Sequence, residues 1–168
     1  MVGIEAEKII PHAAEDIVAA YTDRQFHEHL AAKVGATLLG FDVSGSVPTE
    51  VKIYSKQSMP ADKLPEIAQK VLKGTVTVSI TDTWSAPDAD GSRRSDTVVE
   101  VSGAPIKALA SQTLHARGEA ETKATVRGDV EVKIPLIGKK VKSAAEPYIR
   151  KFVELQAKEV TAWLNKPA

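Results

Sequence analysis

The sequence contains four histidines, whose side chains titrate near neutral pH and can act as acids, bases or metal ligands. They are His12, His27, His29 and His115. His27 and His29 are two residues apart, so on a helix they point in different directions, and His12 with Asp16 forms a pair, which is too few for a ligand set. We therefore predict solvated or structural histidines and no metal site.

Three ionisable residues fall in segments with a strand-like pattern, where burial would shift their pKa values towards those of acid and base catalysts. They are Asp82, Glu100 and His115, and the pattern leaves open which face of a sheet they occupy. The chain has no His-Glu-x-x-His, phosphate-binding loop, nucleophile elbow or Gly-x-Gly-x-x-Gly. No catalytic residue and no cofactor is therefore predicted.

The composition is that of a folded globular protein. The 168 residues are 43% hydrophobic and 26% charged, and their number suits one domain over residues 1–168. Lys plus Arg and Asp plus Glu both number 22, so there is no net basic field to bind nucleic acid. There is no cysteine, which excludes disulfides, thiolate nucleophiles and thiolate metal sites.

Apolar stretches of the chain are short. Residues 1–10 have no apolar run behind a positive charge, and no stretch approaches the roughly 18 apolar residues of a membrane span. We expect a cytoplasmic protein with no integral membrane association.

The N-terminal residues alternate between apolar and polar types, with Val2, Ile4 and Ala6 on one side. This period of two predicts a half-buried strand that ends at Pro11. Apolar residues at helical spacing follow in residues 11–21, which predicts a short helix with Pro11 in its first position.

A second short helix is predicted between Thr22 or Asp23, either of which can cap it, and Gly35, which can end it. Alternating apolar residues and turn signals then predict a hairpin over residues 36–58 and another over residues 75–101. The turns of these hairpins are Ser44–Thr49 and Pro87–Gly91.

Residues 59–73, between the two hairpins, carry apolar side chains at helical spacing and predict a connecting helix that ends at Gly74. Two further strands are predicted over residues 106–117 and 119–134, with a bulge or bend at Gly128. The predicted strands number about seven.

The C-terminal segment changes to a helical period, which predicts a long helix with one buried face. Pro147 lies inside this segment and would cost a hydrogen bond in a helix interior. Ser143 and Glu146 have the spacing of a capping box, so we predict that the helix begins at Ala144 and holds Pro147 in its first turn. The alternative is one helix from Lys139 with a kink near Ser143.

Three lysines precede this predicted start, in a place where the helix dipole makes cations mildly unfavourable. They are Lys139, Lys140 and Lys142. One interpretation is contact with an anion or an acidic lipid. We favour a solvated basic loop, since a helix that begins at Ala144 leaves the lysines outside it.

The order of strand, two short helices, six further strands with a helical interruption, and a long final helix resembles the helix-grip fold of the START-like (SRPBCC) superfamily. Local features are similar to a bacterial domain-of-unknown-function family within it, DUF2505. These features are Pro11, Thr22-Asp23 with Phe26, Trp84 before the turn at Pro87–Gly91, the segment 134–138, and Trp163-Leu164. The resemblance implies an α+β fold in which a curved antiparallel sheet wraps around a long C-terminal helix.

The same resemblance implies an apolar cavity between the sheet and the final helix. Our candidate for the polar contact with a ligand is Tyr148. The residues predicted to bind this ligand are Phe41, Ile53, Ile80, Val99, Tyr148 and Phe152, with Trp84 as a further wall residue. These apolar positions are equally consistent with a packed core. Small residues at inward positions would favour a hollow, and the candidates are Ala108, Ala110, Ala120 and Ala124.

Three functions are compatible with this reasoning. The first is binding of a hydrophobic small molecule or lipid, as carrier or sensor. The second is an enzyme of the cyclase or dehydratase type, which the resemblance implies, using cavity-facing ionisable residues. The third is a protein-interaction module with a filled core and an exposed apolar patch.

Overall fold

A computed structural model describes residues 4–166 of the protein. At its centre is one seven-stranded sheet, in which every neighbouring pair of strands is antiparallel, with the order β1-β7-β6-β5-β4-β3-β2. The strands are β1 (Ile4–Ile10), β2 (Thr37–Gly45), β3 (Val51–Pro60), β4 (Thr75–Trp84), β5 (Arg93–Val101), β6 (Ile106–Ala116) and β7 (Thr122–Val132). This sheet confirms the predicted hairpins.

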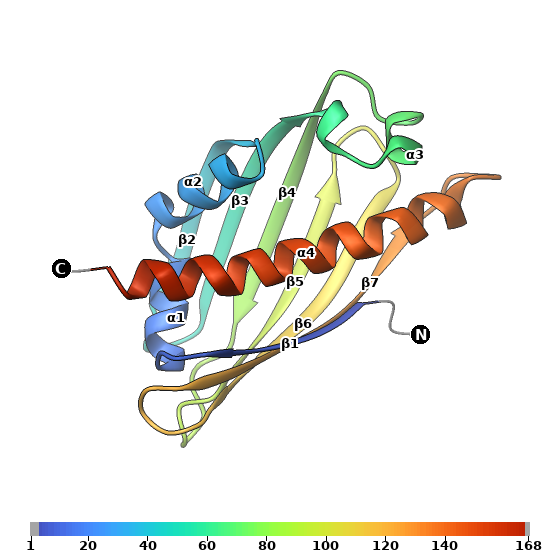
Figure 1. Ribbon diagram of the computed structural model, residues 1–168. Helices are drawn as coiled ribbons and strands as arrows, with labels where there is room; N and C mark the ends of the chain where they lie inside the picture. The colour runs from blue at the N-terminus through green and yellow to red at the C-terminus, as the bar shows by residue number, and fades with distance from the viewer. Residues whose placement is uncertain (1–3, 167–168) are drawn as a thin grey trace.

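In residues 4–166, all helices lie on one side of the sheet (Figure 1). They are α1 (Ala14–Tyr21), α2 (Arg24–Lys33), the 3-10 turn η1 (Ala61–Lys63), α3 (Glu66–Gln69) and α4 (Gly138–Leu164). The sheet curves around α4, with α1 and α2 near the C-terminal end of α4 and α3 near its beginning (Figure 1). The predicted helix-grip architecture is therefore confirmed. Among residues 4–166, no helix is both long and apolar enough to span a membrane.

The first helix begins later than predicted. Pro11 is exposed and lies before α1, which starts at Ala14. Residues 11 and 12 form a bend between strand and helix, and the Thr122 hydroxyl donates to the carbonyl of His12 at 2.7 Å. Of the two caps predicted for α2, Asp23 is the one observed. Its carboxylate accepts a hydrogen bond from the backbone N–H of Gln25 at 2.9 Å.

The connecting helix predicted over residues 59–73 is mostly absent. Strand β3 continues to Pro60, and only η1 and the four residues of α3 are helical. Pro60 and Pro65 explain the difference, because proline disfavours the helical conformation in the residue before it. Tertiary pairing adds to this effect, since Met59 lies opposite Val76 in the β3–β4 ladder.

The final helix begins at Gly138, so the predicted start at Ala144 is wrong and the alternative start near Lys139 is closer. Val141 is 2% exposed, and its burial stabilises the first turns more than a surface capping box at Ser143 can stabilise a later start. Pro147 lies inside the helix, but it and Ser143 are exposed, so water can solvate the carbonyl that lacks a donor.

Gly128 is not a bulge, because its pairing is continuous with Ile4 on one side and with Ala110 on the other. The glycine is needed for close approach between strands. A Cβ atom at this position would lie 2.8 Å from the carbonyl oxygen of Leu109 and 2.9 Å from the Cβ of Ala110. The one irregularity that the described ladders contain lies in β2, between Leu38 and Gly40.

The buried apolar residues form three separate clusters. The largest, which we name the packed end, joins α1, α2, the end of α4 and the neighbouring part of the sheet, and includes Tyr21, Phe26, Trp84, Leu114, Ala124 and Val160. A second cluster surrounds Met59 and Leu72, and a third contains Ile4, Ala108 and Val130. The space between these clusters is the candidate functional site.

Candidate functional site

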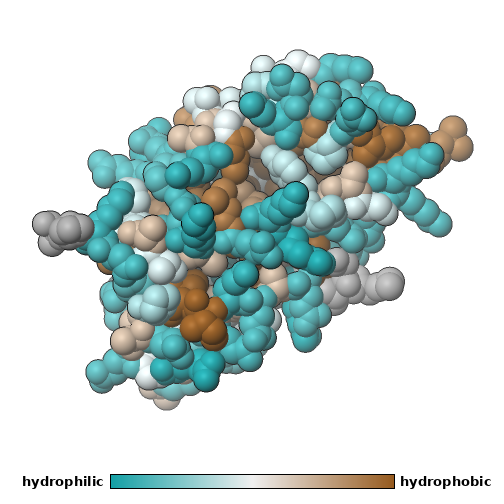
Figure 2. Space-filling view, in the orientation of Figure 1, coloured by the Kyte–Doolittle hydropathy of each residue, from teal (hydrophilic) through white to brown (hydrophobic). Residues whose placement is uncertain are grey.

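A partly open cavity of about 270 Å³ lies between the sheet and α4. Its walls include inward-facing residues of β3 to β7, side chains of α2 and of the η1–α3 segment, and the first two thirds of α4. Figure 2 shows apolar surface between α2, α3 and α4 on this side of the molecule. The volume is near the lower end of small-molecule sites, which range from roughly 300 to 1,000 Å³.

Small residues on neighbouring strands keep this space open. Ala110 lies opposite Gly128 in the β6–β7 ladder and Ala108 lies opposite Val130, and all four line the cavity. The two other small positions considered from the sequence do not contribute. Ala124 is buried in the packed end, and Ala120 is exposed between β6 and β7.

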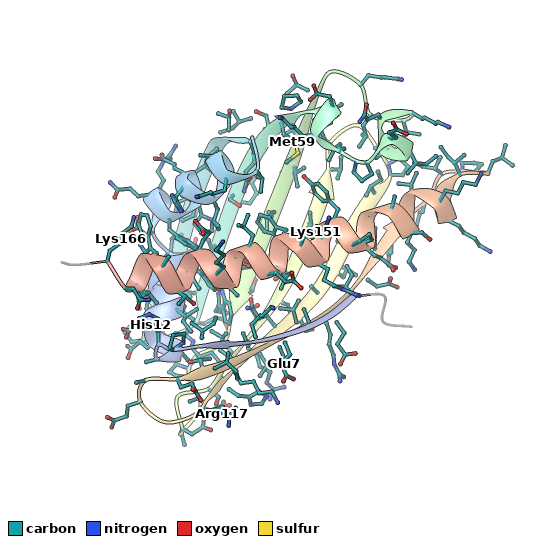
Figure 3. All side chains as sticks on the ribbon, in the orientation of Figure 1. Glu7, His12, Met59, Arg117, Lys151 and Lys166 are labelled. Atoms are coloured by element: carbon teal, nitrogen blue, oxygen red, sulfur yellow. The ribbon has the colours of Figure 1, made fainter. Side chains whose placement is uncertain are left out.

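Four of the six residues predicted to contact a ligand line the cavity. Ile80 and Val99 are paired across β4 and β5, and Tyr148 and Phe152 face them from α4. A role of these residues in binding remains a prediction. The Tyr148 hydroxyl donates weakly to the sulfur of Met59 at 3.8 Å, and burial raises the Tyr148 pKa. Figure 3 shows Met59 near the upper end of β3, beside the segment that contains η1 and α3.

The other two predicted residues, Phe41 and Ile53, lie outside the cavity wall. Phe41 is on β2, where its ring is 4.8 Å from the ring of His27, because α2 packs over this edge of the sheet. Ile53 points inward but is 1% exposed within the packed end. Trp84 borders both regions, since it belongs to the packed end and also lines the cavity.

A carboxyl group, Asp82, faces the cavity from β4. Its partner within the described residues is the hydroxyl of Thr97, which donates to Oδ1 from the paired position on β5. Burial raises the pKa of Asp82 to about 6, and the hydrogen bond from Thr97 acts in the opposite direction. At neutral pH the group is mostly a buried anion, and slightly acidic conditions neutralise it.

Polar atoms of three other residues gather near Asp82, at the boundary with the packed end. The Tyr21 ring stacks on Trp84 with centroids 6.0 Å apart, and burial raises the pKa of Tyr21, with the Asp82 charge adding to the effect. The side chain of Gln112 lies near the Tyr21 hydroxyl and acts against the effect of burial on the Tyr21 pKa. The indole N–H of Trp84 has no acceptor among the described residues. The inner end of the cavity is therefore polar, while its outer part is apolar.

The histidines do not form a common site. His27 lines the cavity and is buried, its Nε2 lies 2.7 Å from the carbonyl of Tyr21, and burial lowers its pKa, so it is neutral at pH 7. His12 bonds to Asn165 at 2.8 Å and His29 to Glu159 at 2.7 Å. Among residues 4–166 there is no group of three or more side chains able to hold a metal ion.

Of the three ionisable residues singled out in strands, only Asp82 faces inward. Glu100 and His115 are exposed on the outer face. The sequence held a signal for this difference, because Asp82 has the same parity as Ile80 and Trp84 in the alternating pattern of β4. Sequence reasoning did not identify Gln112 and Thr97, which lack any distinctive motif.

The three lysines near the start of α4 lie in the helix and not in a loop before it. Lys142 forms an ion pair with Asp129 at 3.0 Å, and Lys139 and Lys140 are exposed. The interpretation as a solvated basic loop is therefore wrong, because the helix begins earlier than Ala144.

Comparison with solved structures identifies the same architecture at low sequence identity. An aromatase/cyclase, Zhui from Streptomyces sp. R1128, matches with a TM-score of 0.58 and 7% identity, covering 95% of this chain and 90% of that one. A START superfamily protein from Mycobacterium smegmatis matches with a TM-score of 0.56 and 15% identity, covering 96% and 98%. Norcoclaurine synthase from Thalictrum flavum, in complex with dopamine and hydroxybenzaldehyde, matches with a TM-score of 0.54 and 13% identity, covering 100% and 89%.

Comparison of sequences adds one family. The model of DUF2505, described as a protein of unknown function, matches residues 5–164. Comparison with curated proteins gives no significant match. The structural similarities fall below 25% identity, so they show the START-like fold and no specific activity.

Proposed function

We propose a function from the premise that this chain belongs to the DUF2505 family of the START-like fold. The function is reversible binding of an apolar small molecule or lipid in the cavity, as a cytoplasmic carrier or sensor. The observation that carries this proposal is the cavity itself, which small residues leave open in an otherwise well-packed sheet and helix. Cores are normally packed with few voids, so a space of about 270 Å³ in a small protein calls for an occupant.

The walls would provide affinity and orientation separately. Transfer of apolar surface from water contributes roughly 25 cal/mol per Å², and most of the wall is aliphatic or aromatic. A few polar groups then fix how the ligand lies. Tyr148 was expected to serve this purpose, and Asp82 with Gln112 is the stronger candidate because these groups lie together at the inner end.

A direct experiment is native mass spectrometry of the gently purified protein, followed by titration with a fluorescent apolar probe. We expect bound mass or probe binding with an emission shift. Ala110→Phe would fill the cavity and abolish binding, while Ser111→Phe, on the outer face of the same strand, would leave it intact. If the wild-type protein binds neither a native ligand nor any of a panel of lipids and aromatics, the proposal fails.

A second candidate function is catalysis of the cyclase or dehydratase type, and one observation favours it. Asp82 is a cavity-facing carboxyl whose pKa of about 6 suits proton transfer near neutral pH. An aromatase/cyclase and a norcoclaurine synthase with bound dopamine and hydroxybenzaldehyde share the fold. The test is exchange of the α-protons of apolar ketones in deuterated water, followed by NMR. Exchange by the wild-type protein that is lost in Asp82→Asn supports catalysis. Equal exchange rates in the two proteins exclude a catalytic role of Asp82.

The third possibility, an interaction module with a filled core, receives less support. It requires a solid interior, whereas the buried residues are separated into three clusters around a cavity. We therefore retain ligand binding as the main proposal.

A further inference from the structure

Asp82 is poorly satisfied where it lies. A carboxylate offers about four acceptor positions, and Thr97 provides the one hydrogen bond that Asp82 receives from residues 4–166. On β3 its neighbour in register is Ile53, which has no polar side chain. Most of the carboxylate's capacity to accept hydrogen bonds therefore faces the cavity.

Among residues 4–166, no cation forms an ion pair with Asp82, and Lys8, which lies near Tyr21 and Gln112, is exposed. Tyr21 of α1, Gln112 of β6 and Gln156 of α4 are neutral, and His27 of α2 is neutral because burial lowers its pKa. Among the described residues that line the cavity, none is a lysine or an arginine. A second carboxylate, Asp129, lies on β7, where Lys142 neutralises it. The inner cavity thus has one unpaired negative charge surrounded by neutral groups.

A buried carboxylate without a partner is costly, and a bound molecule can supply what the protein lacks. A ligand with an N–H or O–H group at one end would donate to Asp82 while its apolar part contacts the aliphatic wall. An apolar carboxylate of the same size would bring a like charge into a region of low dielectric constant, where repulsion is strong. The geometry therefore distinguishes between ligands that differ only at one end.

We propose that the cavity selects apolar molecules with a hydrogen-bond-donating end, an amine or a hydroxyl, and rejects apolar carboxylates such as fatty acids, because Asp82 is the acceptor at its inner end. This inference rests on the proposed binding function and specifies its ligand class. It assigns specificity to a residue on the sheet, whereas the apolar walls supply most of the affinity.

The experiment compares octylamine, 1-octanol and octanoic acid at pH 7.5, each displacing N-phenyl-1-naphthylamine from the cavity. We expect the amine and the alcohol to bind at least about tenfold more tightly than the acid, a difference that corresponds to about 1.4 kcal/mol. The ratio of amine to alcohol then reports how much the cationic charge adds to hydrogen bonding. Equal affinities, or tightest binding of the acid, would overturn the inference.

Variants locate the effect. Asp82→Asn should bring the three affinities to within about threefold of one another, while Asp129→Asn, which changes a carboxylate already paired with Lys142, should preserve the wild-type order. A preference that persists in Asp82→Asn contradicts the assignment.

The two proposals fail in different ways. If the probe and all three compounds fail to bind the folded wild-type protein, the binding function itself is wrong. If the probe binds wild type and Asp82→Asn equally but the three compounds show no order, the cavity binds apolar molecules and only the role of Asp82 is wrong. Circular dichroism of each variant shows that it is folded before its affinities are compared.

Discussion

The packed end and the cavity are two regions built from the same sheet and the same helix, yet one is full and the other is hollow. At the packed end, large side chains such as Trp84, Phe26 and Leu114 meet the end of α4 and are almost completely buried. Towards the start of α4, the sheet presents Ala108 and Ala110 instead. In both regions every second strand residue points towards α4. The volume of these inward side chains therefore decides which region has room for a ligand.

The two regions also treat buried charge differently. Arg93 at the packed end is 1% exposed and donates to the carbonyls of Ser85, Val47 and Thr49, so its donors are used within the protein. Within the part of the chain that the structure describes, Asp82 near the cavity accepts a hydrogen bond only from Thr97. A satisfied buried charge fixes structure, whereas an unsatisfied one is available to a ligand. The comparison can be tested in four ways.

The largest expected effect comes from Arg93→Ala. Arg93 at the start of β5 bonds to the β2–β3 turn and to the residue after β4. Removal of its guanidinium leaves three carbonyls without a donor. At ~1 kcal/mol for each lost hydrogen bond, together with a cavity, we expect unfolding free energy to fall by at least about 3 kcal/mol. Urea denaturation measures this change. The neighbouring Arg94→Ala, at an exposed position, should change stability by less than about 0.5 kcal/mol.

Asp82→Asn should change the unfolding free energy in the opposite direction and stabilise the protein at neutral pH. The pKa of Asp82 is raised in the folded state to about 6, above the ordinary value of about 4, so folding binds a proton between these values and stability falls as pH rises through this range. The substitution should remove that fall and add up to about 3 kcal/mol above pH 7. Thermal unfolding from pH 4 to pH 8 provides the measurement.

The result for Asp82 has a matched control in Asp129. The pKa of Asp129 is lowered, chiefly by its hydrogen bond with Lys142, so Asp129→Asn should not stabilise the protein at neutral pH. Equal stability profiles of wild type and Asp82→Asn across pH 4–8 would mean that the carboxyl is better solvated than the cavity geometry indicates.

Replacement of one alanine by leucine in each region compares the two regions directly. Ala124→Leu at the packed end should overpack the core and reduce stability by about 1–3 kcal/mol. Ala108→Leu adds the same atoms to a wall of the cavity and should change stability by less than about 1 kcal/mol while it weakens probe binding. Chemical denaturation and probe titration of both variants test this, and similar losses of stability at the two sites would show that the cavity does not tolerate larger side chains.

The smallest expected effect concerns the ion pair that ties α2 to the end of α4. His29 lies 2.7 Å and Lys33 lies 3.7 Å from Oε1 of Glu159, and the bond with His29 is the main reason that the Glu159 pKa is lowered. A lowered pKa stabilises the folded state above the ordinary range of glutamate, and this contribution disappears as pH falls through the folded pKa. We expect Glu159→Gln to cost at most about 1 kcal/mol at pH 7.

The Glu159 prediction is checked by thermal unfolding at pH 7 and at pH 3. The exposed Glu154→Gln serves as the control, since it changes the same charge on the outer face of α4. A loss that is as large at pH 3 as at pH 7 would assign the effect to packing and not to charge.

Most strands of the fold could be predicted from the sequence because alternation is a local property. The pattern of β4 and β5, with a turn at Pro87–Gly91, required no knowledge of partners. Helix boundaries were less predictable, as the start of α4 shows. A local capping signal at Ser143 competed with burial of Val141 against distant parts of the chain, and burial won.

The site was predictable to the extent that it follows from alternation. Ile80, Val99, Tyr148 and Phe152 line the cavity, and their contact with a ligand stays a prediction, whereas Ile53 lies in the packed end. Phe41 is drawn to α2 by packing on the edge strand. Nothing within β2 or β3 indicates how close a helix will lie.

The sequence by itself determined the seven strands, the amphipathic final helix and the residues that point inward. These features depend on the order of side chains over a few neighbouring residues of a strand or a few turns of a helix. Only the tertiary structure decided that the interior is hollow and that Asp82 faces the hollow with Thr97 as its partner. Cavity volume depends on the distance between layers and on side chains far apart in the chain. The same distance decides whether a buried carboxylate is satisfied by the protein or left for a ligand.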